Sequence, residues 1–449
     1  MTLIQKLANI HSDKISNMRK AILYYATITI LFIQACNAQK SEQPKISEQE
    51  VARVLKTLSA DDMRGRNAMK PEDISKAADF ISDEFKTAGL AFLKGNDSYQ
   101  QSFLLKTSIP KSGELYVNGI KMAEGNYIVS SAKEHVTLSD MPTIVKIKKG
   151  DDFFAKYSEL SASKEDVLVQ IDESFKTSFE RLKAYLSNGN MEIGDANSPT
   201  IIYLLSNLNV EKIDLNFENK VSKIPMFNVV GILPGKSKPN EYVVFSGHYD
   251  HLGVIDAVNQ DSIANGADDD ASGTTAVIEL AKYFVAKNDN ERTLIFVAFT
   301  AEEIGGYGSQ YFSKQLNPDE VVAMFNIEMI GKTSKFGKNN AFITGYERSD
   351  FGKILQKNLK GTGFRFYPDP YPEQNLFYRS DNATLAKLGV PAHTISSDQI
   401  DTDKLYHSVG DEFETVDVKN ITEIIKAIAI SSGSIVSGQD TPTRVTGVE

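Results

Sequence analysis

Hydrophobic positions divide this chain of 449 residues into three stretches with different patterns. In the first stretch, apolar side chains recur at helical spacing over 48–58 and again over 71–90, which predicts two amphipathic helices. Gly89 lies where the second pattern stops, and glycine is common just past the end of a helix.

The second stretch, residues 102–226, carries short apolar runs such as 143–147 and 200–205, separated by charged and turn-forming segments. Runs of this kind are typical of β-strands. We therefore interpret 102–226 as a smaller, β-rich lobe that is inserted into the main domain.

In the third stretch, from Phe227 onward, apolar strands alternate with helices. This alternation predicts an α/β fold, with a mixed, mainly parallel sheet flanked by helices. The predicted strands cover 242–246, 293–299, 321–327 and 391–395. The predicted helices cover 271–286, 307–315, 350–360, 382–388 and 421–435. The main domain would then comprise 48–101 and 227–437, followed by a disordered tail over 438–449.

The N-terminal residues 1–35 have the pattern of a signal peptide, with a basic start at 18–20 and a nearly uncharged, apolar run over 21–35. That run is shorter than the roughly 20 residues that span a bilayer. We expect an exported protein in which the polar segment 36–47 is a tether.

Cys36 follows Ile33-Gln34-Ala35, which resembles a bacterial lipoprotein box. A lipidated Cys36 would attach the protein to a membrane, as a lipoprotein of the periplasm or outer membrane. Cleavage after Ala38 is one alternative, and it would give a secreted protein. A retained N-terminal anchor is the other. Cys36 is the only cysteine, so the mature domain has no disulfide and no thiolate ligand for zinc.

The formal net charge of −10 gives no electrostatic reason to expect nucleic acid as a partner, because a phosphate binder needs a concentrated basic face. Some of the acidic residues gather instead in patches at the ends of predicted strands. Open α/β sheets place their active sites at such strand ends.

The first patch is His248 and Asp250, directly after the strand 242–246. In extended chain both side chains point the same way, so that Asp250 could orient His248 as carboxylates orient metal-binding imidazoles. A purely structural hydrogen-bonded pair has the same pattern.

The second patch is the triplet Asp268, Asp269 and Asp270. Adjacent carboxylates repel one another, so a buried cluster needs a cation nearby. The alternative is a helix N-terminus, where carboxylates meet free amides. A helix start would explain one or two of the three residues, but not the small residues around them.

The third patch, Glu302 and Glu303, follows the strand 293–299. Neighbouring side chains diverge there, so one carboxylate can hold a metal while the other faces the water, as in general-base hydrolysis. A solvated pair of glutamates is the alternative. Glu328 follows the strand 321–327, and His407 lies in the loop before the last helix.

Two histidines and several carboxylates in one sheet, with no cysteine, predict two divalent ions that share a bridging carboxylate. Zinc is the natural choice for these ligand types. Of the remaining histidines, His393 lies inside an apolar strand and is expected to be a core residue, and nothing assigns His251 a ligand role.

The order of these motifs resembles that of the zinc aminopeptidase family M28. The resemblance covers 51–90 and 227–437 and includes the segment 228–235, and the lobe stands where many relatives have a protease-associated domain. It implies that one zinc is held by His248, Asp269 and Glu328, and the other by Asp269, Glu303 and His407. It also implies that Glu302 is the general base, with peptides as substrates.

Two positions depart from the family pattern, because Glu328 stands where Asp is usual and Asn382 where His is common. Two other function classes share this fold. One is a glutaminyl cyclase-like acyltransferase, which works with one zinc, and the other is a non-catalytic binding protein that has lost the base or ligands. The presence of both ligand sets favours two metals and hydrolysis.

Overall fold

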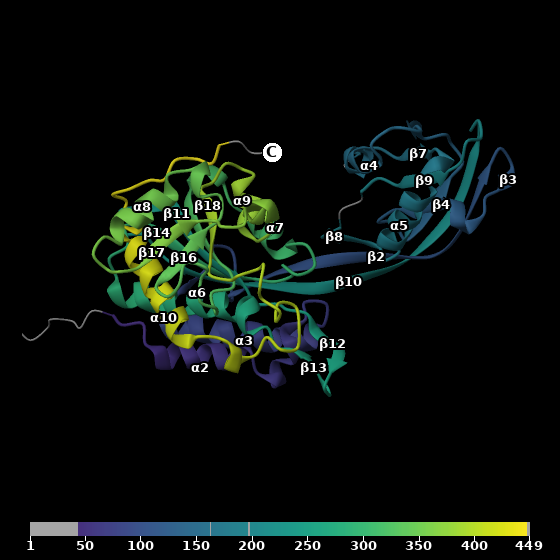
Figure 1. Cartoon of the computed structure of the whole chain (residues 1–449). Helices are drawn as coiled ribbons and strands as arrows, with labels where there is room; N and C mark the ends of the chain where they lie inside the picture. The colour runs from purple at the N-terminus through teal and green to yellow at the C-terminus, as the bar shows by residue number, and fades with distance from the viewer. Residues whose placement is uncertain (1–43, 162, 196–197, 447–449) are drawn as a thin grey trace, which may run out of the picture. The chain divides into compact units, whose positions relative to one another are not determined.

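The computed structural model describes residues 44–161, 163–195 and 198–446 (Figure 1). The predicted signal peptide, and Cys36 with it, lie outside these residues. Within them, no helix combines the length and the apolar character that a membrane crossing requires.

The main domain is built on a mixed sheet whose central strands are parallel, as the alternation of strands and helices predicted. Strands β11, β14, β15 and β18 pair in parallel, whereas β10 joins β14 in antiparallel fashion. The strand order is β17 (Arg365–Pro368), β16 (Asn340–Ile343), β18 (Ala392–Ser396), β15 (Val321–Ile327), β11 (Lys238–His248), β14 (Arg292–Phe299), β10 (Ile213–Leu233), β2 (Gln100–Val117) and β3 (Ile120–Lys121).

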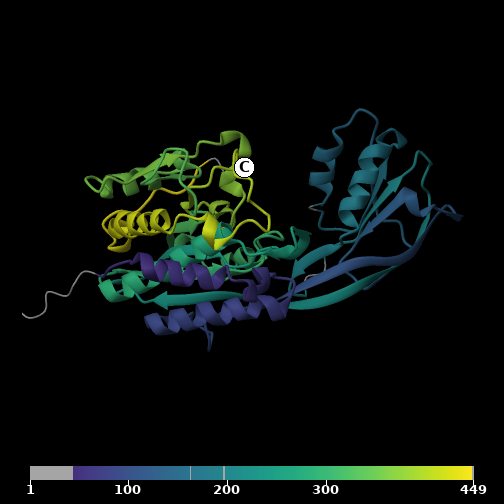
Figure 2. The ribbon, with the colours of Figure 1, turned by 60° about the horizontal axis from the view of Figure 1, so that its bottom comes forward.

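Helices cover both faces of this sheet, because its central strands are apolar on both sides. One core contains side chains from α2 (Glu48–Leu58), α3 (Pro71–Ala88), α6 (Gly273–Lys287), α8 (Phe351–Asn358), α10 (Val418–Ser431) and α11 (Gly433–Val436). The core of the opposite face contains α7 (Tyr307–Ser313) and α9 (Asn382–Ala386). Helices α2 and α3 lie on the same face of the sheet (Figures 1 and 2), and the Arg53 guanidinium of α2 pairs with Glu84 of α3.

Aromatic side chains pack across the central strands. The ring of Phe245 on β11 stacks on Phe325 of β15 at 4.9 Å between centroids and on Phe296 of β14 at 5.4 Å. All three rings are fully buried. Since burying one such side chain contributes about 1.5–3 kcal/mol, this row alone strongly favours the observed pairing.

Capping residues and a glycine set the ends of the two N-terminal helices, α2 and α3. The Ser47 hydroxyl accepts a hydrogen bond from the amide of Glu50 and so caps α2. Helix α3 begins with Pro71 and ends at Gly89, whose φ of 88° is the left-handed conformation that glycine adopts at low cost. Both agree with the predicted ranges to within two residues.

The inserted lobe has its own four-stranded sheet, in the order β4 (Tyr127–Ser130), β9 (Ile201–Leu205), β7 (Val167–Ile171) and β6 (Thr143–Ile147). It also contains two helices that the sequence analysis missed, α4 (Phe153–Ser161) and α5 (Lys176–Leu186). Their apolar residues, such as Phe179, Leu182 and Leu186, do recur at helical spacing, but in short segments between strand-like runs.

The predicted lobe boundaries at 102 and 226 fall inside continuous strands. Strands β2 and β10 pair in antiparallel fashion from Gln100 and Val229 to Val117 and Ile213, and they belong to both the main sheet and the lobe. An uninterrupted strand carries no turn residues at the boundary, so the sequence pattern had no signal there.

Residues 438–446 differ from the expected disordered tail, because they pack against the main domain. Val445 is buried and its amide donates to the carbonyl of Gly389. The Arg444 guanidinium donates to the carbonyls of Pro318 and Val321. Most of these contacts use backbone atoms, which leave no hydrophobic pattern in the sequence.

His393 is a core residue, as its position inside an apolar strand predicted. Its ring is fully buried in β18, with Nε2 2.7 Å from the Ser349 hydroxyl and Nδ1 2.9 Å from the carbonyl oxygen of Thr344. Burial lowers the pKa of His393 to about 4, because the charged imidazolium would lose its hydration.

We predict that His393 makes the protein less stable in mild acid. Between the unfolded pKa near 6.5 and the folded value, the unfolded chain binds more protons than the folded chain. The free energy of unfolding therefore decreases as the pH is lowered, by up to about 1.4 kcal/mol per pH unit. The variant His393→Gln should therefore lose less stability between pH 7 and pH 4.5 than the unmodified protein, as measured by unfolding in urea. His135→Gln makes the same substitution at an exposed position of the lobe and serves as the control for replacing a histidine by glutamine. Parallel profiles for the unmodified protein and His393→Gln would contradict the prediction.

Candidate active site

The polar patches predicted from the sequence meet at the carboxyl edge of the central strands. His248 ends β11, Glu302 and Glu303 follow β14, and Glu328 follows β15. Asp269 lies in the helical turn Ala267–Ser272 before α6, and His407 lies in the loop between β18 and α10. Parallel strands all end at one edge, which explains why residues so far apart in the chain come together.

One group of possible metal ligands comprises His248, Asp269 and Glu328. His248 Nε2 lies 3.2 Å from Asp269 Oδ1 and 3.3 Å from Glu328 Oε1. Nitrogen and oxygen donors converging at this distance suit a divalent ion such as zinc.

A second group is arranged around the other oxygen of Asp269. His407 Nε2 lies 3.2 Å from Asp269 Oδ2 and 3.1 Å from Glu303 Oε2. Asp269 therefore directs one oxygen to each group, which is the arrangement of a bridging ligand.

His251 also belongs to this second group, although the sequence analysis assigned it no role. Its Nδ1 lies 2.7 Å from Glu303 Oε1 and 3.8 Å from Asp269 Oδ2, and its ring is buried. Gly266 makes room for this ring, since a Cβ there would come within 2.6 Å of it. The glycine before the aspartate triplet was the only sign in the sequence that another group comes close to the backbone there. Only the fold shows that this group is the ring of His251.

The pKa values of His248 and His407 are raised by the carboxylates around them, as expected for a site that attracts cations. Although burial opposes it, the carboxylates of Glu328, Asp250 and Asp269 raise the pKa of His248 well above its ordinary value. Burial is likewise outweighed at His407, where Asp269 and Glu303 raise the pKa to about 10. The clustered carboxylates thus attract positive charge, and divalent ions would supply it in place of the protons.

The three carboxylates of the aspartate triplet have different partners, and only the amide of Gly273 belongs to the start of α6. Asp268 Oδ1 accepts from the amide of Gly331. Asp270 accepts from the amides of His248, Gly273 and Met329. These two carboxylates satisfy backbone amides, and Asp269 is the one whose oxygens both face histidines.

Asp250 lies beside His248, but its carboxylate mainly fixes the backbone of the glutamate pair. It accepts from the amides of Glu302 and Glu303 at 3.1 and 3.3 Å. His248 Nδ1 is 3.1 Å from the backbone carbonyl of Asp250 and 3.6 Å from its carboxylate. Asp250 therefore links the end of β11 to the turn after β14 and orients His248 chiefly through a main-chain oxygen.

Glu328 reaches the first group despite its extra methylene. Its Oε1 faces His248, and its Oε2 accepts a hydrogen bond from the Ser380 hydroxyl. Asn382, the other departure from the family pattern, is buried and donates to the carbonyls of Phe377 and Ala392. Asn382 therefore holds the chain around α9.

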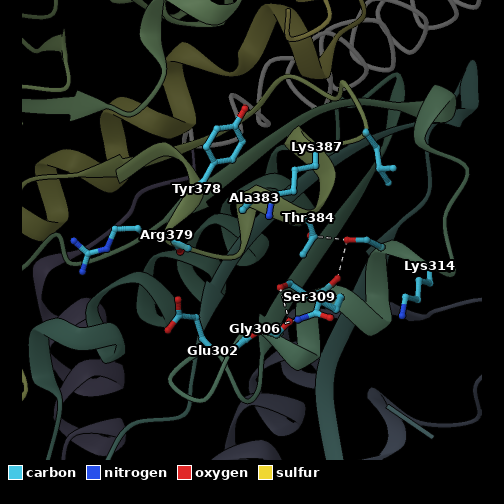
Figure 3. A pocket seen from close by; sticks show the side chains of 14 residues that line it. Glu302, Gly306, Ser309, Lys314, Tyr378, Arg379, Ala383, Thr384 and Lys387 are labelled. Carbon is cyan, nitrogen blue, oxygen red and sulfur yellow. Dashed lines mark hydrogen bonds between the residues drawn. The ribbon is translucent and has the colours of Figure 1, made fainter. Parts of the chain in front are cut away.

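Glu302 lies at the junction of two cavities beside the ligand groups. The smaller cavity, about 270 Å³, is lined by Asp269, Glu303, Glu328 and His407, by the charged Arg379 and Asp398, and by apolar side chains, namely Met329, Phe342, Leu376 and Ile400. The larger one, about 650 Å³, begins at Glu302 and extends past α7 and α9 (Figure 3). Burial raises the pKa of Glu302 well above its ordinary value, which suits a group that accepts and returns a proton.

Arg66 organises the loops that carry the ligands, and no pattern in the sequence indicated it. Its fully buried guanidinium donates to the carbonyls of Tyr249, Asn265 and Gly266 at 2.6–2.9 Å. It also donates to the carbonyl of Leu58 at the end of α2. One side chain thus holds the loop after His248 and the loop before Asp269.

Comparison with known proteins finds relatives that are similar to part of this chain. Residues 228–431 match the model of Peptidase family M28. A probable zinc metalloprotease of Pyrenophora teres f. teres is 37% identical over 123 residues, which are 26% of this chain and 25% of the relative. Leucine aminopeptidase 1 of Paracoccidioides brasiliensis is 29% identical over 215 residues, 44% of this chain and 53% of the relative. The chain thus spans a quarter to about half of the length of these curated relatives.

Two solved structures share the fold. An aminopeptidase from Aneurinibacillus sp. strain AM-1 has a TM-score of 0.51 and 18% identity, covering 90% of this chain and 96% of that chain. A zinc aminopeptidase from Bacillus subtilis has a TM-score of 0.52 and 15% identity, covering 91% and 100%. At this level of identity the likeness concerns the fold alone.

We predict that Arg66→Lys weakens both stability and metal binding. Lysine keeps the charge but cannot reproduce the planar set of donors, so buried carbonyls lose their partners. Unfolding in urea should show a loss of about 3 kcal/mol, and a zinc titration should show weaker binding at both ligand groups.

The neighbouring Arg64 provides a matched control, because its side chain is exposed and pairs with Asp73. Arg64→Lys should leave zinc affinity unchanged. An Arg66→Lys protein with the stability and zinc affinity of the unmodified protein would show that the carbonyl contacts are dispensable.

Proposed function

Residues 228–431 of this chain belong to Peptidase family M28, and from this premise we propose that the protein is a two-zinc aminopeptidase that removes N-terminal residues from peptides. The observation that carries the proposal is the arrangement of Asp269, whose two oxygens face two separate histidine groups beside the carboxylate of Glu302.

The chain's own residues provide a complete ligand set for two ions. His248, Asp269 and Glu328 would hold one zinc, and Asp269, Glu303 and His407 would hold the other. His251 contacts the Glu303 oxygen that does not face His407, and so keeps the other oxygen available. Imidazole and carboxylate donors without a thiolate are typical of catalytic zinc sites.

Zinc ions, when bound, polarise the scissile carbonyl and lower the pKa of water. Glu302 takes a proton from the attacking water and then gives it to the nitrogen of the leaving amine. Asp250 keeps Glu302 and Glu303 in divergent positions by binding both of their amides. This division allows one carboxylate to hold an ion and its neighbour to move a proton.

The smaller cavity supports removal of one residue at a time. Its volume of about 270 Å³ lies just below the usual range of pockets for small ligands, and four apolar side chains line it together with the ligand residues. A single apolar side chain at the peptide's N-terminus fits this lining.

We predict close to two zinc ions per chain in the purified, metal-replete protein, measured by inductively coupled plasma mass spectrometry. Chelation should abolish hydrolysis of aminoacyl substrates, and added zinc should restore it. Glu303→Gln should lower the zinc content, because the carboxylate loses its charge. Full activity with one zinc per chain, or with none, would exclude the two-zinc centre.

We also predict that Glu302→Gln lowers turnover by about 10²–10⁴-fold, the usual contribution of a general base, while the zinc content stays at two. Steady-state kinetics and metal analysis on the same preparation separate the two effects. Glu180→Gln on α5 of the lobe, where the side chain is exposed, is the control and should behave as the unmodified protein. Near-normal turnover of Glu302→Gln would assign the base to another residue.

A further inference from the structure

The larger cavity beside Glu302 is lined by three cations. Lys314 follows α7, Arg379 follows the turn Leu376–Tyr378, and Lys387 follows α9 (Figure 3). Glu302 is the one carboxylate in its lining. In the part of the chain that the structure describes, none of the three cations forms an ion pair with a carboxylate.

The other polar side chains of this lining are already engaged within the protein. The Ser309 hydroxyl donates to the carbonyl of Gly306, and the hydroxyls of Ser313 and Thr384 lie 2.7 Å apart. Gln310 donates to the carbonyl of Gly305. The cations are therefore the side chains left to recognise an anionic ligand, although the Lys387 ammonium also lies over the Tyr378 ring at 5.8 Å.

The position of Glu302 indicates which part of a peptide substrate the larger cavity would bind. The ligand residues Asp269, Glu303, Glu328 and His407 line the smaller cavity and not the larger, whereas Glu302 lines both. The reacting carbonyl must lie at the ligands, and the proton donor must reach the leaving nitrogen. The part of the substrate peptide that follows the cleaved bond therefore extends past Glu302 into the larger cavity.

We propose that the larger cavity binds the leaving segment of the peptide and selects a negative charge on it. The charge can be an acidic side chain directly after the cleaved bond or the C-terminal carboxylate of a short peptide. This inference rests on the proposed aminopeptidase function and adds the class of preferred substrate. Because all three cations are exposed, each contributes a few-fold preference, which salt should weaken.

The test compares kcat/KM for peptides that share an N-terminal leucine and differ after the cleaved bond. Leu-Asp amide carries an anionic side chain, Leu-Asn with a free C-terminus carries an anionic end, and Leu-Asn amide carries neither. We expect the unmodified protein to favour one or both anionic peptides over Leu-Asn amide by about tenfold at low ionic strength, and by less in 0.5 M salt. Which peptide is favoured identifies the source of the charge.

Lys314→Gln and Lys387→Gln should each lower the ratio of anionic to neutral kcat/KM by about two- to fivefold. Lys353 on α8 is an exposed lysine outside both cavities, so Lys353→Gln is the matched control and should leave the ratio unchanged. A ratio near one in the unmodified protein, or a ratio that the two cavity variants do not change, would overturn the inference while leaving the aminopeptidase function intact.

Calorimetric binding separates this inference from the proposed function. The Glu302→Gln protein is titrated with the same three peptides, so that binding is measured without cleavage. If no peptide is hydrolysed by the metal-replete unmodified protein, the proposed function fails. Tighter binding of an anionic peptide that is lost on adding Lys314→Gln would still support the cationic cavity, and equal binding of all three would overturn it.

Discussion

The active-site edge of this protein depends on one buried cation, the guanidinium of Arg66. It donates to main-chain carbonyls from the end of α2, the loop after β11 and the loop before α6. A buried carbonyl without a partner costs about 1–3 kcal/mol, so these loops have one favourable arrangement only while Arg66 is present. Asp269 and Asp411 lie near enough to favour its charge, which offsets part of the cost of burying it.

The carboxylates of the candidate site separate into two kinds according to what they bind. Asp268, Asp270 and Asp250 accept hydrogen bonds from backbone amides and so hold the loops in shape. Asp269, Glu303 and Glu328 instead face histidine rings. A dense acidic cluster is tolerable here because half of it is satisfied by amides and the other half is arranged for cations.

Sequence patterns predicted the parts of the molecule that depend on local periodicity. The strands β11, β14, β15 and β18 and the residues at their ends follow from apolar runs, and the position of His393 followed from the same runs. Arg66 and His251 could not be found in this way, because their roles are set by carbonyls and carboxylates far away in the chain. The two helices of the lobe and the packing of 438–446 were missed because short segments and main-chain contacts leave little hydrophobic pattern.

The continuous pairing of β2 with β10 has a consequence for the order in which the chain folds. The contact between Asn228 and Gln101 joins residues that are 127 positions apart, and closing so long a loop is entropically slow. If the lobe folds first, packing against its four-stranded sheet brings Val117 and Ile213 together and replaces the long loop with a short connection. Pairing can then proceed from the lobe towards β14. We therefore expect the inserted lobe to act as the nucleation site for one edge of the main sheet.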